Sequence, residues 1–175
     1  VYVIGKFGII RGRDEFLEAL KRKDIDLREF EALASRMGSA ERIAAEAIGQ
    51  TETRFRDKRL GNVQIHGTSA SFGPMVRLDV VGGRYFSEAE DRAALQLAVI
   101  GADVKDELFG ALDPLGREVL VGGQPFRVIG LLAKQGRTLG ENRDAKVFVP
   151  IEAYRRLLGV RGSLNILVQS RNGVA

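Results

Sequence analysis

The sequence contains no cysteine and no tryptophan, and His66 is its single histidine in 175 residues. The absence of cysteine excludes disulfide bonds, thiolate nucleophiles and cysteine-ligated metals, and one histidine argues against an ordinary zinc site. No apolar run approaches the roughly 20 residues of a membrane-spanning helix, and no secretory signal segment opens the chain. The first residue is not methionine, which indicates a piece of a longer protein. The missing membrane helices therefore say little about the parent.

Hydrophobic residues make up 45% of the chain and charged residues 29%, as in soluble globular proteins. The net charge of +4 is spread along the sequence. Its densest cluster is Arg54, Arg56, Lys58 and Arg59, interrupted by Asp57. Such a cluster can contact anionic lipid headgroups or nucleic acid. No aromatic residues alternate with it and no nucleic-acid-binding signature lies nearby, so we expect a solvated hairpin tip and no nucleic-acid partner.

The first half predicts a strand–helix–strand–strand unit. Residues 1–4 alternate as a strand, and residues 14–23 have apolar positions at helical spacing. A clearer helix begins at Asp26, which forms a capping-box pattern with Glu29, and Gly38 is a natural end for it. Its apolar stripe, which we interpret as a core face and not as a partner-binding groove, comprises Leu27, Phe30, Leu33 and Met37. Two alternating strands then flank the basic cluster and form a hairpin.

The second half is divided into short elements by turn residues. Ser87 and Glu90 repeat the capping pattern, and Gly122-Gly123 is a two-residue hairpin turn that tolerates positive φ. Around them we expect strands at residues 95–100, 119–121, 126–128, 147–149 and 164–168, and helices at residues 103–109 and 151–158. The polar segment 136–144 is expected to be a mobile loop.

No constellation of catalytic residues stands out. A Ser-His-Asp triad has to use His66, which occupies a polar position of an expected strand beside Gly67, Thr68 and Ser69. We interpret it as an exposed or hydrogen-bonded strand residue, and not as a catalytic base.

Two other patterns have structural explanations. Residues 98–103 resemble the strand-to-helix turn of nucleotide-binding folds, but they hold one glycine where the dinucleotide fingerprint needs three. Glu88, Glu90 and Asp91 fit no calcium-loop spacing, and stabilisation of a helix N-terminus explains Glu88 and Glu90. We therefore expect no catalytic, cofactor-binding or metal-binding residues, no cofactor, and no enzymatic activity.

Six short motifs, taken in order, resemble one family. They are Gly83-Arg84-Tyr85-Phe86-Ser87 with Glu90, Ala98-Val99-Ile100-Gly101, Leu108-Phe109-Gly110, Asp113-Pro114-Leu115-Gly116, Pro125-Phe126-Arg127-Val128-Ile129-Gly130 and Val147-Phe148-Val149-Pro150. Each motif alone is weak, but the order over about 70 residues resembles the extracytoplasmic (periplasmic) core domain of MacB-type, or FtsX-like, ABC transporter permeases.

This resemblance implies an α+β fold with two lobes. A porter-like strand–helix–strand lobe would comprise residues 1–81 and 163–175, and a small inserted α/β lobe residues 82–162. The resemblance places the domain on the extracytoplasmic face of the bacterial cytoplasmic membrane, where it couples cytoplasmic ATP hydrolysis to conformational change for export of substrates such as antibiotics or peptides. The implied partners are the transmembrane helices of the same permease, an ABC ATPase domain or subunit, a second permease copy and a periplasmic adaptor protein.

Three alternatives stay open. A LolC/LolE-like permease would release lipoproteins instead of exporting small molecules. A soluble extracytoplasmic binding module would use the cleft between the lobes or the 136–144 loop for a ligand. A hydrolase would use His66, and this is the weakest of the three.

Overall fold

The structure is a computed structural model that describes residues 2–5, 14, 21, 23–36, 41–138, 141–142, 144–159 and 163–170. Within these residues strands and short helices are mixed along the chain, which confirms the predicted α+β class. The strands are β1 (Tyr2–Ile4), β2 (Glu41–Phe55), β3 (Lys58–Thr68), β4 (Val80–Gly83), β5 (Leu97–Ile100), β6 (Glu118–Val121), β7 (Gln124–Leu132), β8 (Arg137–Thr138), β9 (Glu141–Asn142), β10 (Lys146–Pro150) and β11 (Asn165–Ser170). The helices are α2 (Leu27–Arg36), α3 (Phe72–Val76), α4 (Glu88–Arg92), α5 (Ala102–Val104), the π-helix η1 (Lys105–Phe109) and α6 (Ile151–Leu157).

Six of these strands close into a small barrel. Neighbouring strands pair in the order β2, β3, β10, β5, β7 and β6, and β6 completes the ring by pairing with β2. The closing contact is short, with Thr53 opposite Val121 and Arg54 opposite Leu120. Because the ring is closed, every strand in it is hydrogen-bonded to a neighbouring strand on each side, as in other barrels. The ring is therefore expected to move as one body.

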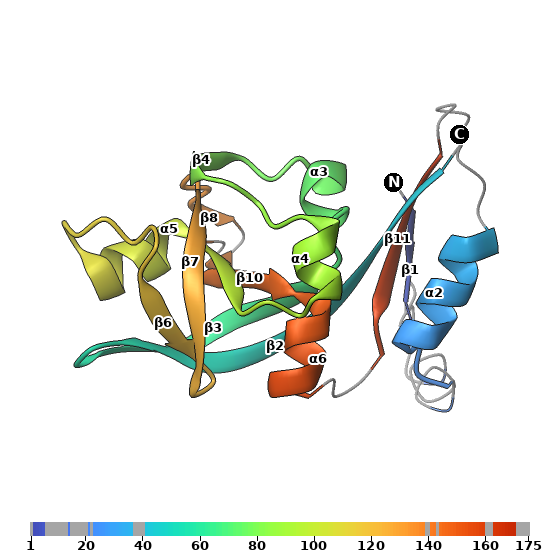
Figure 1. Ribbon diagram of the computed structural model, residues 1–175, viewed down its shortest axis with the longest axis horizontal. Helices are drawn as coiled ribbons and strands as arrows, with labels where there is room; N and C mark the ends of the chain where they lie inside the picture. The colour runs from blue at the N-terminus through green and yellow to red at the C-terminus, as the bar shows by residue number, and fades with distance from the viewer. Residues whose placement is uncertain are drawn as a thin grey trace.

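The sheet continues beyond the barrel through the first part of β2. There β11 pairs with residues 41–46 of β2, and β1 pairs with β11, placing Tyr2 opposite Val168. Figure 1 shows β1, β11 and α2 together at the end of the molecule opposite the β2–β3 turn. One continuous strand, β2, thus connects the β1–β11 pair to the barrel.

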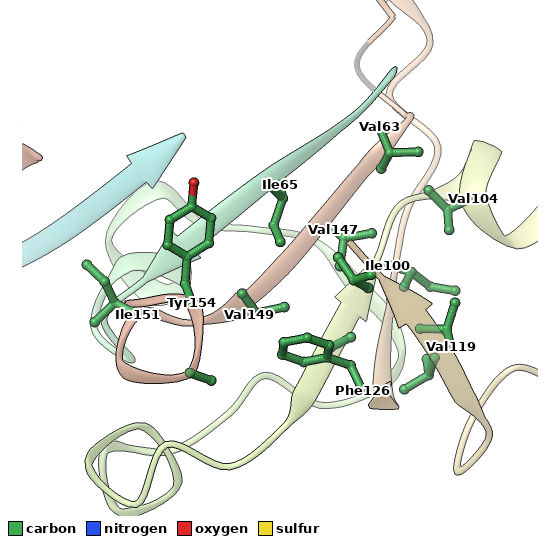
Figure 2. Close-up of a cluster of buried hydrophobic side chains, with 14 of the residues drawn as sticks. Val63, Ile65, Ile100, Val104, Val119, Phe126, Val147, Val149, Ile151 and Tyr154 are labelled. Atoms are coloured by element: carbon green, nitrogen blue, oxygen red, sulfur yellow. The ribbon is translucent and has the colours of Figure 1, made fainter. Parts of the chain in front are cut away.

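The main hydrophobic cluster fills the barrel. Figure 2 shows side chains from different strands converging there, among them Val63, Ile100, Val119, Phe126 and Val147, and these five are fully buried. Side chains of η1 and α6 belong to the same cluster, so two helices extend the barrel core. Full burial of a valine or phenylalanine side chain contributes about 1.5–3 kcal/mol, and this core therefore supplies much of the stability.

A close approach of α6 to the sheet explains one glycine. The ring of Tyr154 on α6 lies over β3 at Gly67, where an added Cβ would be 2.5 Å from the Tyr154 Cγ. Only a residue without a side chain fits there, because the ring cannot retreat from a packed core.

A second cluster covers the other side of the sheet. Phe72 on α3 and Phe86 pack with Phe148 of β10, and all three are nearly fully buried. Residues from β2, β5, β7 and β11 complete this cluster. The sheet thus has a hydrophobic cluster on each face, although Val3, Ile48 and Val81 stay exposed.

Local turn and cap predictions are confirmed. Asp26 and Glu29 exchange the two capping-box hydrogen bonds at 2.9 and 3.1 Å, and Ser87 forms the predicted capping box with its N3 residue. Gly122 and Gly123 have φ values of 57° and 80°, the conformation that a two-residue hairpin favours.

Some predictions lie outside the described residues or stay untested. Of the expected helix at 14–23 only residues 14, 21 and 23 are described, and the expected helix end at Met37 and Gly38 is outside them. The division at residues 81/82 stays a prediction. Sheet pairing crosses it, because β3 pairs with β10 and β2 with β6.

Candidate functional site

A groove of about 490 Å³ lies between α2 and the helices α4 and α6. Its floor is formed by β2 and the turn between β3 and α3. The lining residues are Leu27, Phe30, Glu31, Ala34, Arg42, Ile43, Ser69, Ala70, Ser71, Glu88, Asp91, Arg92, Ile151 and Glu152. The groove therefore lies where the β1–β11–α2 end of the molecule meets the barrel.

Two serines link the two segments that form the floor of the groove. Ser69 Oγ accepts the backbone N–H of Ala45 at 3.0 Å, and Ser71 Oγ donates to the Ile43 carbonyl at 2.6 Å. The two hydroxyls also lie 3.1 Å apart. Both serines are thus engaged in holding the β3–α3 turn against β2, and their hydrogen-bond partners include no histidine or lysine base among the described residues.

Asp91 on α4 connects three elements beneath the groove. Its Oδ1 accepts the backbone N–H of Glu152 at 3.4 Å, and it also bonds the backbone N–H groups of Ile151 and Ala70. The N-cap residue of α6 is Pro150, and its side chain makes no capping hydrogen bond. Asp91 on α4 instead accepts hydrogen bonds from the free N–H groups at the start of α6.

Burial of Asp91 has an electrostatic consequence. The residue is 9% exposed, and burial raises the pKa of its carboxyl group from 3.8 to about 6. The nearby charge of Glu152 raises it further, while the backbone hydrogen bonds lower it. Asp91 is thus a partly desolvated carboxylate that titrates in the weakly acidic range.

The rim of the groove carries both signs of charge. Glu88 pairs with Arg92 at 3.0 Å along α4, and Glu152 pairs with Arg155 at 2.9 Å along α6. Glu31 and Arg42 face the groove from α2 and β2. The apolar lining between these charges makes the groove suited to contact or closure between the two sides.

His66 packs against the second cluster, away from the groove lining. Its Nδ1 is 2.8 Å from Glu46 Oε1, and its ring stacks on Phe148 with centroids 4.7 Å apart. The residue is 7% exposed, and its buried Nε2 has no hydrogen-bond partner among the described residues. The hydrogen-bonded interpretation is confirmed and the exposed one is wrong. Among the described residues no hydroxyl bonds Nε2, and the hydrolase alternative stays untested.

Tyr85 and Thr68 form a second buried polar contact near His66. Their hydroxyl oxygens lie 2.6 Å apart, and burial raises the pKa of the Tyr85 phenol. Thr68 follows His66 on the same face of β3, two residues on. This hydrogen bond holds the segment before α4 against the sheet.

Glu88, Glu90 and Asp91, the three carboxylates examined as cation ligands, each interact with different partners. Glu90 accepts two hydrogen bonds from Arg84, at 2.7 and 2.8 Å, and caps α4 with Ser87. Hydrogen bonding to Arg84 and to the Ser87 backbone lowers the pKa of Glu90 to about 2. Glu88 pairs with Arg92 and Asp91 turns inward. Across the described ranges no group of three or more acidic or histidine side chains could hold a metal ion.

The segment 136–144 contains a small hairpin. Strands β8 and β9 pair there, with Arg137 opposite Asn142. Asp144 closes its base by accepting the backbone N–H groups of Gln135 and Gly136, each at 2.7 Å. Where the structure describes this segment, it is thus hydrogen-bonded at its base, and its predicted mobility stays untested.

Sequence patterns did not identify the burial of Asp91 or the residues that line the groove, although a cleft between the two expected lobes was among the alternatives. The first-turn position of Asp91 in a short helix is typical of a solvated residue, and nothing nearby in sequence signals its burial. Its partners, Ala70, Ile151 and Glu152, lie 21 to 61 residues away.

Comparisons with known proteins agree with one another. A family model described as MacB-like periplasmic core domain matches residues 3–175. The pyoverdine export ATP-binding/permease protein PvdT of Pseudomonas aeruginosa is 35% identical over 116 residues, which are 63% of this chain and 18% of that protein. The macrolide export ATP-binding/permease protein MacB of Bdellovibrio bacteriovorus is 28% identical over 153 residues, 87% of this chain and 23% of that protein. The chain therefore spans about a fifth of the length of these relatives.

The fold also matches solved structures. The periplasmic region of MacB from Actinobacillus actinomycetemcomitans superimposes with a TM-score of 0.79 at 17% identity, covering 99% of this chain and 75% of that one. The extracellular domain of the ABC-type transporter YknZ from Gram-positive bacteria gives 0.72 at 22% identity, covering 86% and 75%. Within the described residues, no helix has the length and apolarity needed to cross a membrane.

Proposed function

The chain belongs to the family of MacB-like periplasmic core domains, and from this premise we propose that it relays motion outside the cytoplasm for an ABC export permease. In this proposal the domain lies on the extracytoplasmic face of the bacterial cytoplasmic membrane. ATP is hydrolysed elsewhere in the transporter, and this domain catalyses no reaction itself. Its role is to change shape when the rest of the permease does.

The continuity of β2 carries the proposal. Its first six residues pair with β11, and its end closes the barrel against β6. A strand rises about 3.3 Å per residue, so the 15 residues of β2 extend over roughly 45 Å. Because β1 and β11 are antiparallel neighbours, Tyr2 lies opposite Val168 at the end of β2 that is away from the barrel closure. A displacement there is transmitted through β2 to the whole barrel.

The groove is the place where such a displacement can be accommodated. On one side α2 contributes apolar side chains of which none is fully buried, and on the other α4 and α6 are held to the barrel through Asp91. A contact with half-buried side chains on one side and a hydrogen-bonded anchor on the other favours relative movement of the two sides.

The names of the relatives support export. PvdT and MacB are called export ATP-binding/permease proteins, so we propose an ABC ATPase and transmembrane helices as partners, with small-molecule export favoured over LolC/LolE-like lipoprotein release. A second permease copy and an adaptor protein are further proposed partners. Pyoverdine and macrolides are the cargo named for those relatives, and we propose a cargo of similar size without choosing between them.

Reversible locking of the groove tests the relay. In the complete parent transporter, without other cysteines, Glu31→Cys on α2 and Arg92→Cys on α4 are joined by a bis-methanethiosulfonate linker. If ATP binding changes the width of the groove, fixing that width changes the affinity for ATP by the same coupling free energy. Locking should therefore lower the ATPase rate at subsaturating ATP, and reduction should restore it.

A matched control uses the same reagent to link two positions that both lie on the barrel. Glu118 and Arg127 are exposed register partners on β6 and β7, so linking cysteines at these positions should leave the ATPase rate unchanged. Equal inhibition by both pairs, or by neither, would contradict the relay.

A soluble binding module is the second candidate, favoured by the apolar lining of the groove. Under this alternative a ligand occupies the groove and raises the melting temperature of the chain. Phe30→Ser on α2 should abolish that increase while the barrel stays folded. The relay predicts no such ligand-dependent increase.

A further inference from the structure

Four cations form a cluster where the β2–β3 hairpin ends at the barrel rim. We call Arg54, Arg56, Lys58 and Arg59 the basic rim. Arg54 and Arg59 are cross-strand partners, and Lys58 is opposite Phe55. Figure 1 shows this turn at the end of the molecule opposite β1 and β11. Asp57 lies in the same turn, but within the described part of the chain none of the four cations makes an ion pair.

The backbone beneath the basic rim is fixed in place. Phe55 stacks on Phe109 of η1 with ring centroids 4.2 Å apart, and β6 pairs with β2 at Arg54. The Arg56 guanidinium lies 5.1 Å from the centroid of the Phe55 ring. The cations are therefore displayed on an anchored hairpin end, and little ordering of the backbone is required when a partner binds.

Charge repulsion within the basic rim favours an external anion. Like charges directly opposite each other on neighbouring strands destabilise a hairpin, and Arg54 faces Arg59 in this way. An arginine also binds carboxylates through two parallel hydrogen bonds. A carboxylate placed between the two guanidinium groups would relieve the repulsion and satisfy both.

We propose that the basic rim is a docking site for an acidic segment of a partner protein. The choice of a protein over a lipid surface rests on the proposed function. If the membrane lies beyond β1 and β11, the rim is roughly 45 Å away along β2. Charges are screened over about 8–10 Å at physiological salt, so lipid headgroups do not act on it.

Binding of a short fluorescein-labelled poly-glutamate peptide to the 175-residue chain, followed by fluorescence anisotropy, tests this docking site. Arg54→Gln combined with Arg59→Gln should weaken binding about tenfold, at about threefold for each ion pair lost. The melting temperature should stay equal or rise, because the repulsion is removed. A fall in melting temperature would show that these arginines support the fold, and would overturn the proposal.

The matched control removes two charges at the other end of the molecule. Arg28 and Arg36 are exposed on α2, and their replacement by glutamine changes the net charge equally. It should alter peptide affinity less than about twofold, a bound set by long-range charge alone. An equal loss in both variants would mean that only net charge matters, and would overturn the docking site.

Two further probes decide the class of partner. A neutral poly-glutamine peptide should not bind. Vesicles rich in phosphatidylglycerol should bind the wild type more weakly than the poly-glutamate peptide does, and rim-dependent vesicle binding stronger than peptide binding would replace the protein partner with a membrane. These affinities do not depend on the groove, so failure of the docking site and failure of the relay are measured separately.

Discussion

Replacement of Asp91 by asparagine should make the chain's stability respond differently to pH. Asp91 is buried between α4, α6 and the β3–α3 turn, and its pKa rises from 3.8 to about 6 on folding. The native state therefore binds more protons than the unfolded state between these two values. Stability from this group consequently increases as the pH falls from 6 toward 4.

The magnitude follows from the two pKa values. One pKa unit corresponds to about 1.4 kcal/mol, so the ionised Asp91 lowers the free energy of unfolding by about 3 kcal/mol at neutral pH. About 2 kcal/mol of this is recovered between pH 7 and pH 4.5. The asparagine side chain cannot ionise but keeps an oxygen that accepts the Glu152 N–H, so the substitution removes the titration and retains that hydrogen bond.

Urea unfolding of both proteins at several pH values between 7 and 4.5 measures the effect. The difference in free energy of unfolding, variant minus wild type, should fall by about 2 kcal/mol toward acid, whatever its value at pH 7. Taking the difference cancels the titration of all other groups. A difference that stays constant, or grows toward acid, would refute the burial argument for Asp91.

Further predictions concern the same sheet and helix. Gly67→Ala should lower the free energy of unfolding by about 1–3 kcal/mol, because the Tyr154 ring occupies the space of the new Cβ. Gly61→Ala is the control: its Cβ meets nothing within 4 Å, and the free energy of unfolding should change by less than about 0.5 kcal/mol. Glu90→Gln should destabilise at pH 7, since its pKa of about 2 is set by Arg84 and the Ser87 backbone, and this loss should vanish as the pH falls from 4.5 to 2. Acid unfolding of wild type and E90Q checks the sign, which is opposite to that for Asp91.

Local chemistry determined which parts of the fold could be predicted. The capping boxes at Asp26 and Ser87 and the hairpin at Gly122-Gly123 depend on residues at most three positions apart. Their geometry therefore follows from the sequence alone, and the structure confirms each of them. The order of six such local motifs also carried the family resemblance.

Features built from distant residues could not be predicted. Barrel closure depends on two residue pairs between β2 and β6, such as Thr53 with Val121, which are 68 residues apart. The polar neighbours of His66 leave open whether it is exposed or hydrogen-bonded, whereas Phe148 and Glu46 from other strands enclose it. The groove has the same origin, since its lining extends from residue 27 to residue 152.

The nucleotide dependence of the groove width tests the relay most directly. Spin labels at Glu31→Cys and Arg92→Cys in the complete parent transporter report the distance between α2 and α4 by double electron–electron resonance. The relay predicts a shifted distance distribution with trapped ATP compared with the nucleotide-free state. Labels at the register partners Glu118→Cys and Arg127→Cys are too close for this pulsed method, and the dipolar broadening of their continuous-wave spectrum should be the same in both states. Identical α2–α4 distributions in both nucleotide states would contradict it.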